Sequence, residues 1–76
     1  MKNISVDPTI HFGKPCLTGT RITVQSVLEL LSEGLTADEI IQDYYPDLKP
    51  EHIKACLDYA TALVAGEEIH LSSLSA

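Results

Sequence analysis

The position of helix-capping residues relative to apolar stripes is the feature that most constrains this chain. Thr23 precedes a stripe at helical spacing and can accept a free backbone N–H, and Gly34 follows it as a left-handed cap. Thr36 with Glu39 three residues later is a capping box that starts a second helix. The stripes consist of Val24, Val27, Leu28 and Leu31, then Ile40 and Ile41. The pattern therefore predicts two short helices joined at Gly34.

A third helix is predicted after the run Tyr45-Pro46-Asp47, which ends the second. Pro50 suits its first turn, and Gly66 is expected to close it. Lys49 has no acceptor for a backbone N–H, so we expect this helix to fray at its start or to be capped by Asp47. Its apolar stripe consists of Ile53, Cys56, Leu57, Ala60, Leu63 and Val64. If the stripe packs inward, Glu51, Lys54, Ala55, Asp58 and Ala62 face outward.

The residues before the helices read as extended chain interrupted by turns. Asp7-Pro8 breaks a short alternating segment, and Gly19 with Thr20 forms a turn and cap. We therefore divide the chain into a β-hairpin or arm (residues 1–22), a helical bundle (residues 23–66) and a tail (residues 67–76). The expected fold is mainly α: a tri-helical bundle of helix-turn-helix layout behind a small N-terminal β arm. The same layout is also a generic packing solution for short helices.

Size and composition exclude several classes of protein. Seventy-six residues with four aromatic side chains form one small aliphatic core, which a second subunit often completes, so we expect a homodimer. No apolar run is long enough to span a membrane, and no signal peptide is recognisable. Two cysteines forty positions apart are expected to stay reduced, which places the protein in the cytoplasm.

The charge is unevenly distributed along the chain. The net charge is −6, yet residues 1–28 carry Lys2, Lys14 and Arg21 against the single carboxylate Asp7. Because an acidic body repels phosphate, any DNA contact must come from these three cations, with Lys54 as a further candidate. The outward face of the third helix holds one lysine and two acids, which disfavours base readout. Arg21 has two interpretations: a phosphate or partner contact, or an ion pair, within the chain or across a dimer, with a carboxylate such as Asp7 that holds the arm against the bundle.

No catalytic, metal or cofactor site is expected. The sequence lacks a nucleophile elbow, a phosphate-binding loop and a paired-histidine motif. His52 and Cys56 lie four residues apart on the third helix and can in principle reach one metal, with His11 and Cys16 completing a set. Cys56 is more simply a small core residue on the apolar stripe.

Several motifs together resemble one family. They are Asp7-Pro8, Gly13-Lys14-Pro15, Gly19-Thr20-Arg21-Ile22-Thr23-Val24, Gly34 to Ile40, Tyr45-Pro46-Asp47-Leu48, Ile53 and Ala55 to Ala60. Over about residues 4–65 the chain resembles the prokaryotic domain-of-unknown-function family numbered 433. The resemblance implies a homeodomain-like helix-turn-helix fold behind a β arm. It also implies a small antitoxin, loosely of the VapB type, encoded beside a PIN-like nuclease toxin.

The tail is the expected contact with that toxin. Ile69-His70-Leu71 alternates as an added strand would, Leu74 adds a third apolar side chain, and Glu67 and Glu68 suit a basic nuclease cleft. The expected function is therefore non-enzymatic: neutralisation of a PIN-like toxin, with autorepression of the operon through operator DNA. The alternatives are a disordered or self-packed tail, and a non-catalytic interaction or structural homodimer module without a toxin.

Overall fold

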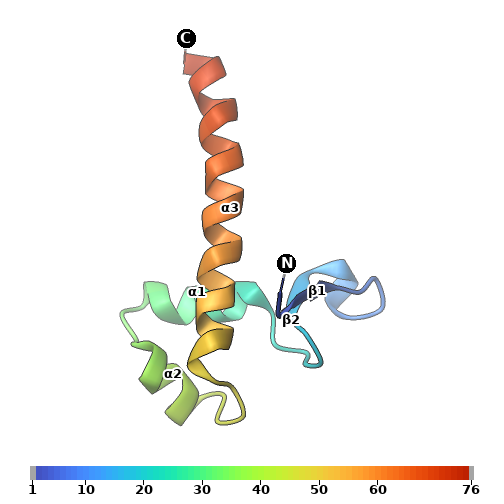
Figure 1. Cartoon of the computed structure of the whole chain (residues 1–76), viewed down its shortest axis with the longest axis vertical. Coiled ribbons are helices and arrows are strands. Elements are labelled where there is room, and N and C mark those ends of the chain that lie inside the picture. Colours follow the sequence, from blue (N-terminus) through green and yellow to red (C-terminus); the bar gives the residue numbers. More distant parts are fainter. Residues whose placement is uncertain (1, 76) are drawn as a thin grey trace.

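The computed structural model describes the backbone of residues 2–75 and the side chains of residues 2–66. Two strands, β1 (Ile4–Val6) and β2 (Pro15–Leu17), are joined through a tight turn, η1 (His11–Gly13). Three helices follow: α1 (Val24–Ser32), α2 (Ala37–Asp43) and α3 (Pro50–Ser75). Figure 1 shows α3 rising out of the group formed by the other elements. No helix within the described residues has the length and apolar character needed to cross a bilayer.

The predicted caps form as hydrogen bonds. The Thr23 hydroxyl accepts the backbone N–H of Ser26 at 3.0 Å and starts α1. Thr36 and Glu39 form the full capping box of α2, with bonds of 2.9 and 3.2 Å. Gly34 has a φ of +98°, the left-handed conformation expected between α1 and α2. These sequence signals fixed the helix starts correctly because each acts within one turn of chain.

The start of α3 uses a cap that the sequence analysis did not foresee. The backbone N–H of Lys49 donates to Nδ1 of His52 at 2.9 Å, and the His52 N–H donates to the Lys49 carbonyl at 2.9 Å. The imidazole therefore does what a glutamate does in an ordinary capping box. The expected cap by Asp47 is wrong, because a side chain inside the first turn satisfies the free N–H.

The predicted end of α3 is also wrong. We expected Gly66 to close the helix, but the helical backbone continues to Ser75. Gly66 does not have the positive φ that a left-handed cap requires. A glycine inside a helix costs about 1 kcal/mol relative to alanine, which weakens a helix without ending it. Residues 67–75 are thus a continuation of α3 in this structure, and not an added strand.

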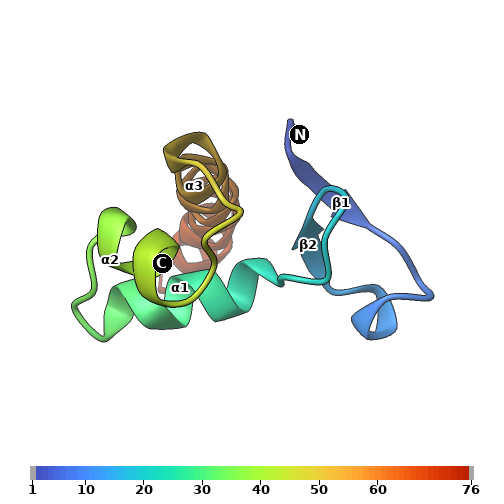
Figure 2. The ribbon, with the colours of Figure 1, turned by 90° about the horizontal axis from the view of Figure 1, so that it is seen from below.

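The hairpin is antiparallel and is fastened to the start of α1. Ile4 pairs with Leu17, and Val6 pairs with Pro15. On the edge that faces away from β1, β2 bonds to the residues just before α1: Leu17 donates its N–H to the Ile22 carbonyl at 2.9 Å. Figure 2 shows the hairpin beside α1, on one side of the helices. The turn at Gly19 and Thr20 is closed by the Thr20 hydroxyl, which bonds the Leu17 carbonyl at 2.8 Å.

The core lies where β2 and the three helices meet. It is entirely aliphatic apart from one cysteine and consists of Leu17, Val24, Val27, Ile40, Leu48, Ile53 and Cys56. Ala55, expected on the outer face of α3, is buried instead, because the β1 side of the hairpin packs against this helix. The sequence could not show this contact, which joins residues fifty positions apart.

Candidate interaction surfaces

The upper part of α3 carries apolar side chains that the body does not cover. Leu57, Leu63 and Val64 are 46%, 53% and 49% exposed, although the sequence places them on the same stripe as buried Ile53 and Cys56. Figure 1 shows that α3 extends beyond the other elements, and only the first part of its stripe is buried. A helix whose apolar side stays in water is marginally stable by itself, so this exposed side of α3 is a candidate interaction surface.

A groove between α1 and α3 adjoins this surface. It encloses about 560 Å³ and is lined mainly by apolar side chains, with Lys14 and Glu29 among its few charged ones. The apolar lining includes Val24, Leu28, Tyr59, Leu63 and Val64. The Lys14 ammonium donates to the Gln25 side chain at 3.3 Å. Leu28 was predicted only as part of the apolar stripe of the first helix, and no role was predicted for Tyr59, since the groove exists only once α1 and α3 are packed together.

The predicted tail residues fall on the last part of α3. Ile69, Leu71 and Leu74 belong to a helical stretch of backbone, and their side chains lie outside the described residues. Each helical residue advances by 100°, so positions 71 and 74 continue the stripe of Leu57 and Val64. Position 69 falls on the other side of the helix. The strand-like alternation that linked Ile69 to Leu71 therefore does not hold in this structure.

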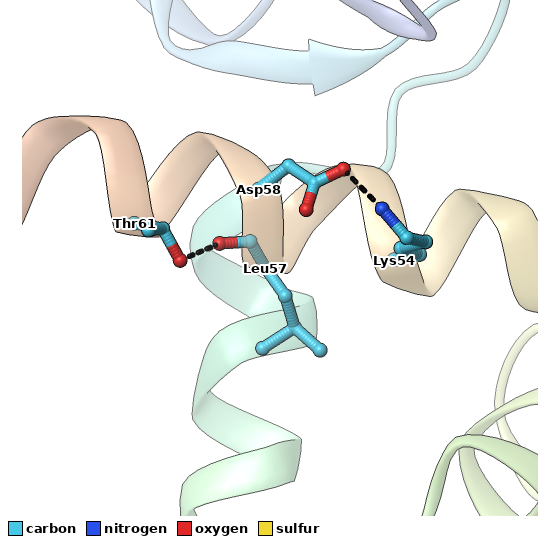
Figure 3. A network of polar contacts seen from close by, with 4 residues as sticks. All are labelled: Lys54, Leu57, Asp58 and Thr61. Atoms are coloured by element: carbon cyan, nitrogen blue, oxygen red, sulfur yellow. Dashed lines mark hydrogen bonds and ion pairs between the residues drawn. The ribbon is translucent and has the colours of Figure 1, made fainter.

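The four predicted DNA-contacting cations do not gather on one surface. Lys2 and Lys54 line a small hollow between β1 and α3, Lys14 lines the groove, and Arg21 lines a third hollow beside the hairpin. All four side chains are exposed. Lys54 is paired with Asp58 on the next turn of α3 at 2.9 Å (Figure 3). The chain thus presents dispersed charges, and not a continuous basic patch.

Arg21 does not pair with Asp7. Within the described residues it forms no ion pair, although both side chains line the same hollow. Asp7 instead accepts the Thr9 backbone N–H at 2.8 Å and the Thr9 hydroxyl at 2.7 Å. These two bonds hold the pKa of Asp7 below its usual value, and the bond from the Thr9 hydroxyl has the larger effect. The expected Arg21–Asp7 pair is thus not formed within the chain, because Thr9, two positions away, already donates two hydrogen bonds to the carboxylate.

The possible metal set is not assembled. His52 uses Nδ1 to cap α3, and Cys56 is fully buried in the core. Burial raises the pKa of the Cys56 thiol to about 11, which disfavours the thiolate that a metal would need. Among the described residues, no three histidine, cysteine or acidic side chains lie close enough together to hold a metal ion.

The hairpin tip presents an aromatic side chain that the sequence analysis missed. Phe12 is fully exposed, and His11, Phe12 and Gly13 have successive φ angles of +49°, +57° and +81°. For residues other than glycine this conformation costs roughly 1–2 kcal/mol each. The glycine after Phe12 signalled a turn, but nothing local showed that the ring would point into solvent.

A family model matches residues 4–60 and carries the description "Protein of unknown function (DUF433)". The chain belongs to this family. The matched range of the DUF433 model contains the hairpin, α1, α2 and the part of α3 that packs on them. No curated protein and no solved structure matches the chain. The resemblance read from the motifs is thus confirmed, and the exposed Leu63 and Val64 lie beyond the end of the DUF433 match.

Proposed function

We propose that this DUF433 protein is an antitoxin-like homodimer that binds and neutralises a PIN-like nuclease toxin through the end of α3. The observation that carries the proposal is the projecting helix itself. Its apolar side chains Leu63 and Val64 are half exposed, and the sequence continues with Glu67 and Glu68. An apolar stripe edged by acids suits a helix-binding groove near a basic nuclease cleft.

The tri-helical part is proposed to be a homeodomain-like helix-turn-helix that autorepresses its operon. Base readout by α3 is disfavoured, since Ala55 is buried under the hairpin and Lys54 is paired with Asp58. The proposal therefore assigns phosphate contacts to Lys2, Lys14 and Arg21 from both subunits. Its expected signature is promoter binding that weakens steeply as salt is raised.

The toxin contact is tested by changing the end of α3. Deleting residues 67–76 should leave the body folded, because every core residue precedes position 57. The same deletion should abolish binding to the PIN-like protein of the neighbouring gene. Leu71→Asp should weaken the complex by about 2 kcal/mol, or roughly thirtyfold in Kd. Ser73→Asp, on the other side of the helix, is the matched control and should have little effect. Calorimetric titration measures the affinity of the intact chain, the truncated chain and the two substituted chains for the PIN-like protein.

Two outcomes contradict the proposal in different ways. Equal affinities of the intact and truncated proteins would remove the end of α3 from the toxin contact. No binding by either protein would replace the antitoxin interpretation with the alternative, a non-catalytic interaction module.

A further inference from the structure

One hollow on α3 has the shape of a helix-binding surface. Leu57, Ala60, Thr61 and Val64 surround it, with Ala65 at its edge. Residues at positions i, i+3, i+4 and i+7 form the hole that receives a side chain of a facing helix in knobs-into-holes packing. Leu57 and Val64 are each about half exposed, and the three residues between and beside them are small. The surface is therefore suited to the close approach of another helix.

The hollow carries neither a charge nor an unsatisfied polar group. The Thr61 hydroxyl donates to the Leu57 carbonyl of its own helix at 2.8 Å, so it needs no partner across an interface (Figure 3). Lys54 and Asp58 pair with each other at 2.9 Å on the same helix. Covering the hollow thus removes apolar surface from water without leaving a buried donor unpaired.

We propose that a second copy of the chain covers this hollow, with the two α3 helices antiparallel. The surface is self-complementary: with a two-fold axis between Ala60 and Thr61, Leu57 of each copy lies level with Val64 of the other. A symmetric dimer of this kind needs only one patch per chain. The inference rests on the homodimer of the proposed function and gives it a surface, but it does not depend on a toxin.

Charge favours a second copy in this orientation. Each chain carries −6, so two copies can approach only along an uncharged strip such as this one. A parallel pair would bring Glu67 and Glu68 of both copies together. The antiparallel pair instead places Lys54 of one copy level with Glu67 and Glu68 of the other. The Lys54–Asp58 pair is largely exposed and therefore weak, so Lys54 is free to exchange partners. Residues 69–75 extend beyond the paired segment and remain available for a toxin, whereas Val64, Glu67 and Glu68 can contact either the second copy or the toxin, and not both at once.

The assignment of the hollow to a second copy is tested by sedimentation of the intact chain at micromolar concentration. The natural protein should sediment as a dimer of the 8.3 kDa chain. Val64→Asp places a carboxylate in the hollow, and dimer formation would then have to remove this charge from water. The substitution should therefore weaken the dimer by about thirtyfold or more. Ala62→Asp introduces the same charge on the opposite side of α3 and should leave the dimer unchanged. Circular dichroism checks that both variants are helical.

The orientation is tested by exchanging charges. Lys54→Glu should weaken the dimer by about tenfold, because two symmetric pairs become repulsive at once. Combining Lys54→Glu with Glu68→Lys should restore most of the natural affinity. Lys49→Glu makes the same charge change just before α3 begins and should have little effect.

Each contrary result overturns a defined part of the inference. A monomer at these concentrations would reject the second copy as the occupant. If Val64→Asp then abolished toxin binding, the hollow would belong to the toxin, and the toxin contact of the proposed function would survive without the homodimer. A natural dimer that tolerates Val64→Asp would reject this face. Failure of the double exchange to restore affinity would reject the antiparallel arrangement.

Discussion

The start of α3 and the segment around Leu63 and Val64 occupy different surroundings although they share one apolar stripe. Near its start, Ile53 and Cys56 are buried against α1, α2 and β2, whereas two turns later Leu63 and Val64 are half in water. The spacing of apolar residues is the same in both parts. Burial therefore depends on where the body ends, and an apolar stripe that continues beyond the body stays exposed to water.

The comparison is tested most strongly by removing one apolar side chain from each region. Ile53→Ala should destabilise the protein by about 2–5 kcal/mol, because Ile53 is buried near the start of α3 and its loss leaves a cavity. Leu63→Ala should change the free energy of unfolding by less than about 0.5 kcal/mol. Urea unfolding, at a protein concentration where the chain is monomeric, measures the change in the free energy of unfolding for both variants. Similar losses would mean that the upper part of α3 is packed on the body.

The boundary between the two regions can be located through the Cys56 thiol. Burial raises its pKa from an ordinary value near 9.0 to about 11. The unfolded chain therefore loses this proton at lower pH than the folded one, and stability falls as pH rises from 9.0 towards 11. Cys56→Ala should remove this part of the alkaline loss. Denaturation midpoints of both proteins across that pH window give the difference, and parallel curves would place the thiol in contact with solvent.

The smallest expected effects come from two glycines with opposite roles. Gly34→Ala should destabilise the protein by about 1 kcal/mol, since its φ of +98° is strained for alanine. Gly66→Ala should instead stabilise the upper part of α3 locally by about 0.5–1 kcal/mol, because an added Cβ meets no atom within 4 Å. Circular dichroism and thermal unfolding distinguish the two. A loss of helix in Gly66→Ala would contradict a continuous α3.

The sequence was most informative where one turn of chain decides the structure. Thr23, Gly34 and the Thr36–Glu39 box fixed the helix boundaries, and the family motifs were recognised from residues alone. It failed where distant segments meet, as when the hairpin covers Ala55. It also failed at Gly66, because glycine disfavours a helix only weakly and the neighbouring residues keep the backbone helical. The predicted cations were correctly placed on the surface, but their dispersal over three hollows follows from packing, which no local pattern encodes.

The hydrogen bonding of β2 on both edges has a consequence for the way the molecule opens. Leu17 donates to Ile22, and Cys16 forms a bridge with Thr23, the residue that caps α1. The hairpin cannot lift away without releasing that cap, and α1 cannot fray at its start without loosening the hairpin. The amides along this junction therefore belong to one cooperative unit, whose hydrogen exchange requires sub-global unfolding and not the local breathing usual for a three-residue strand.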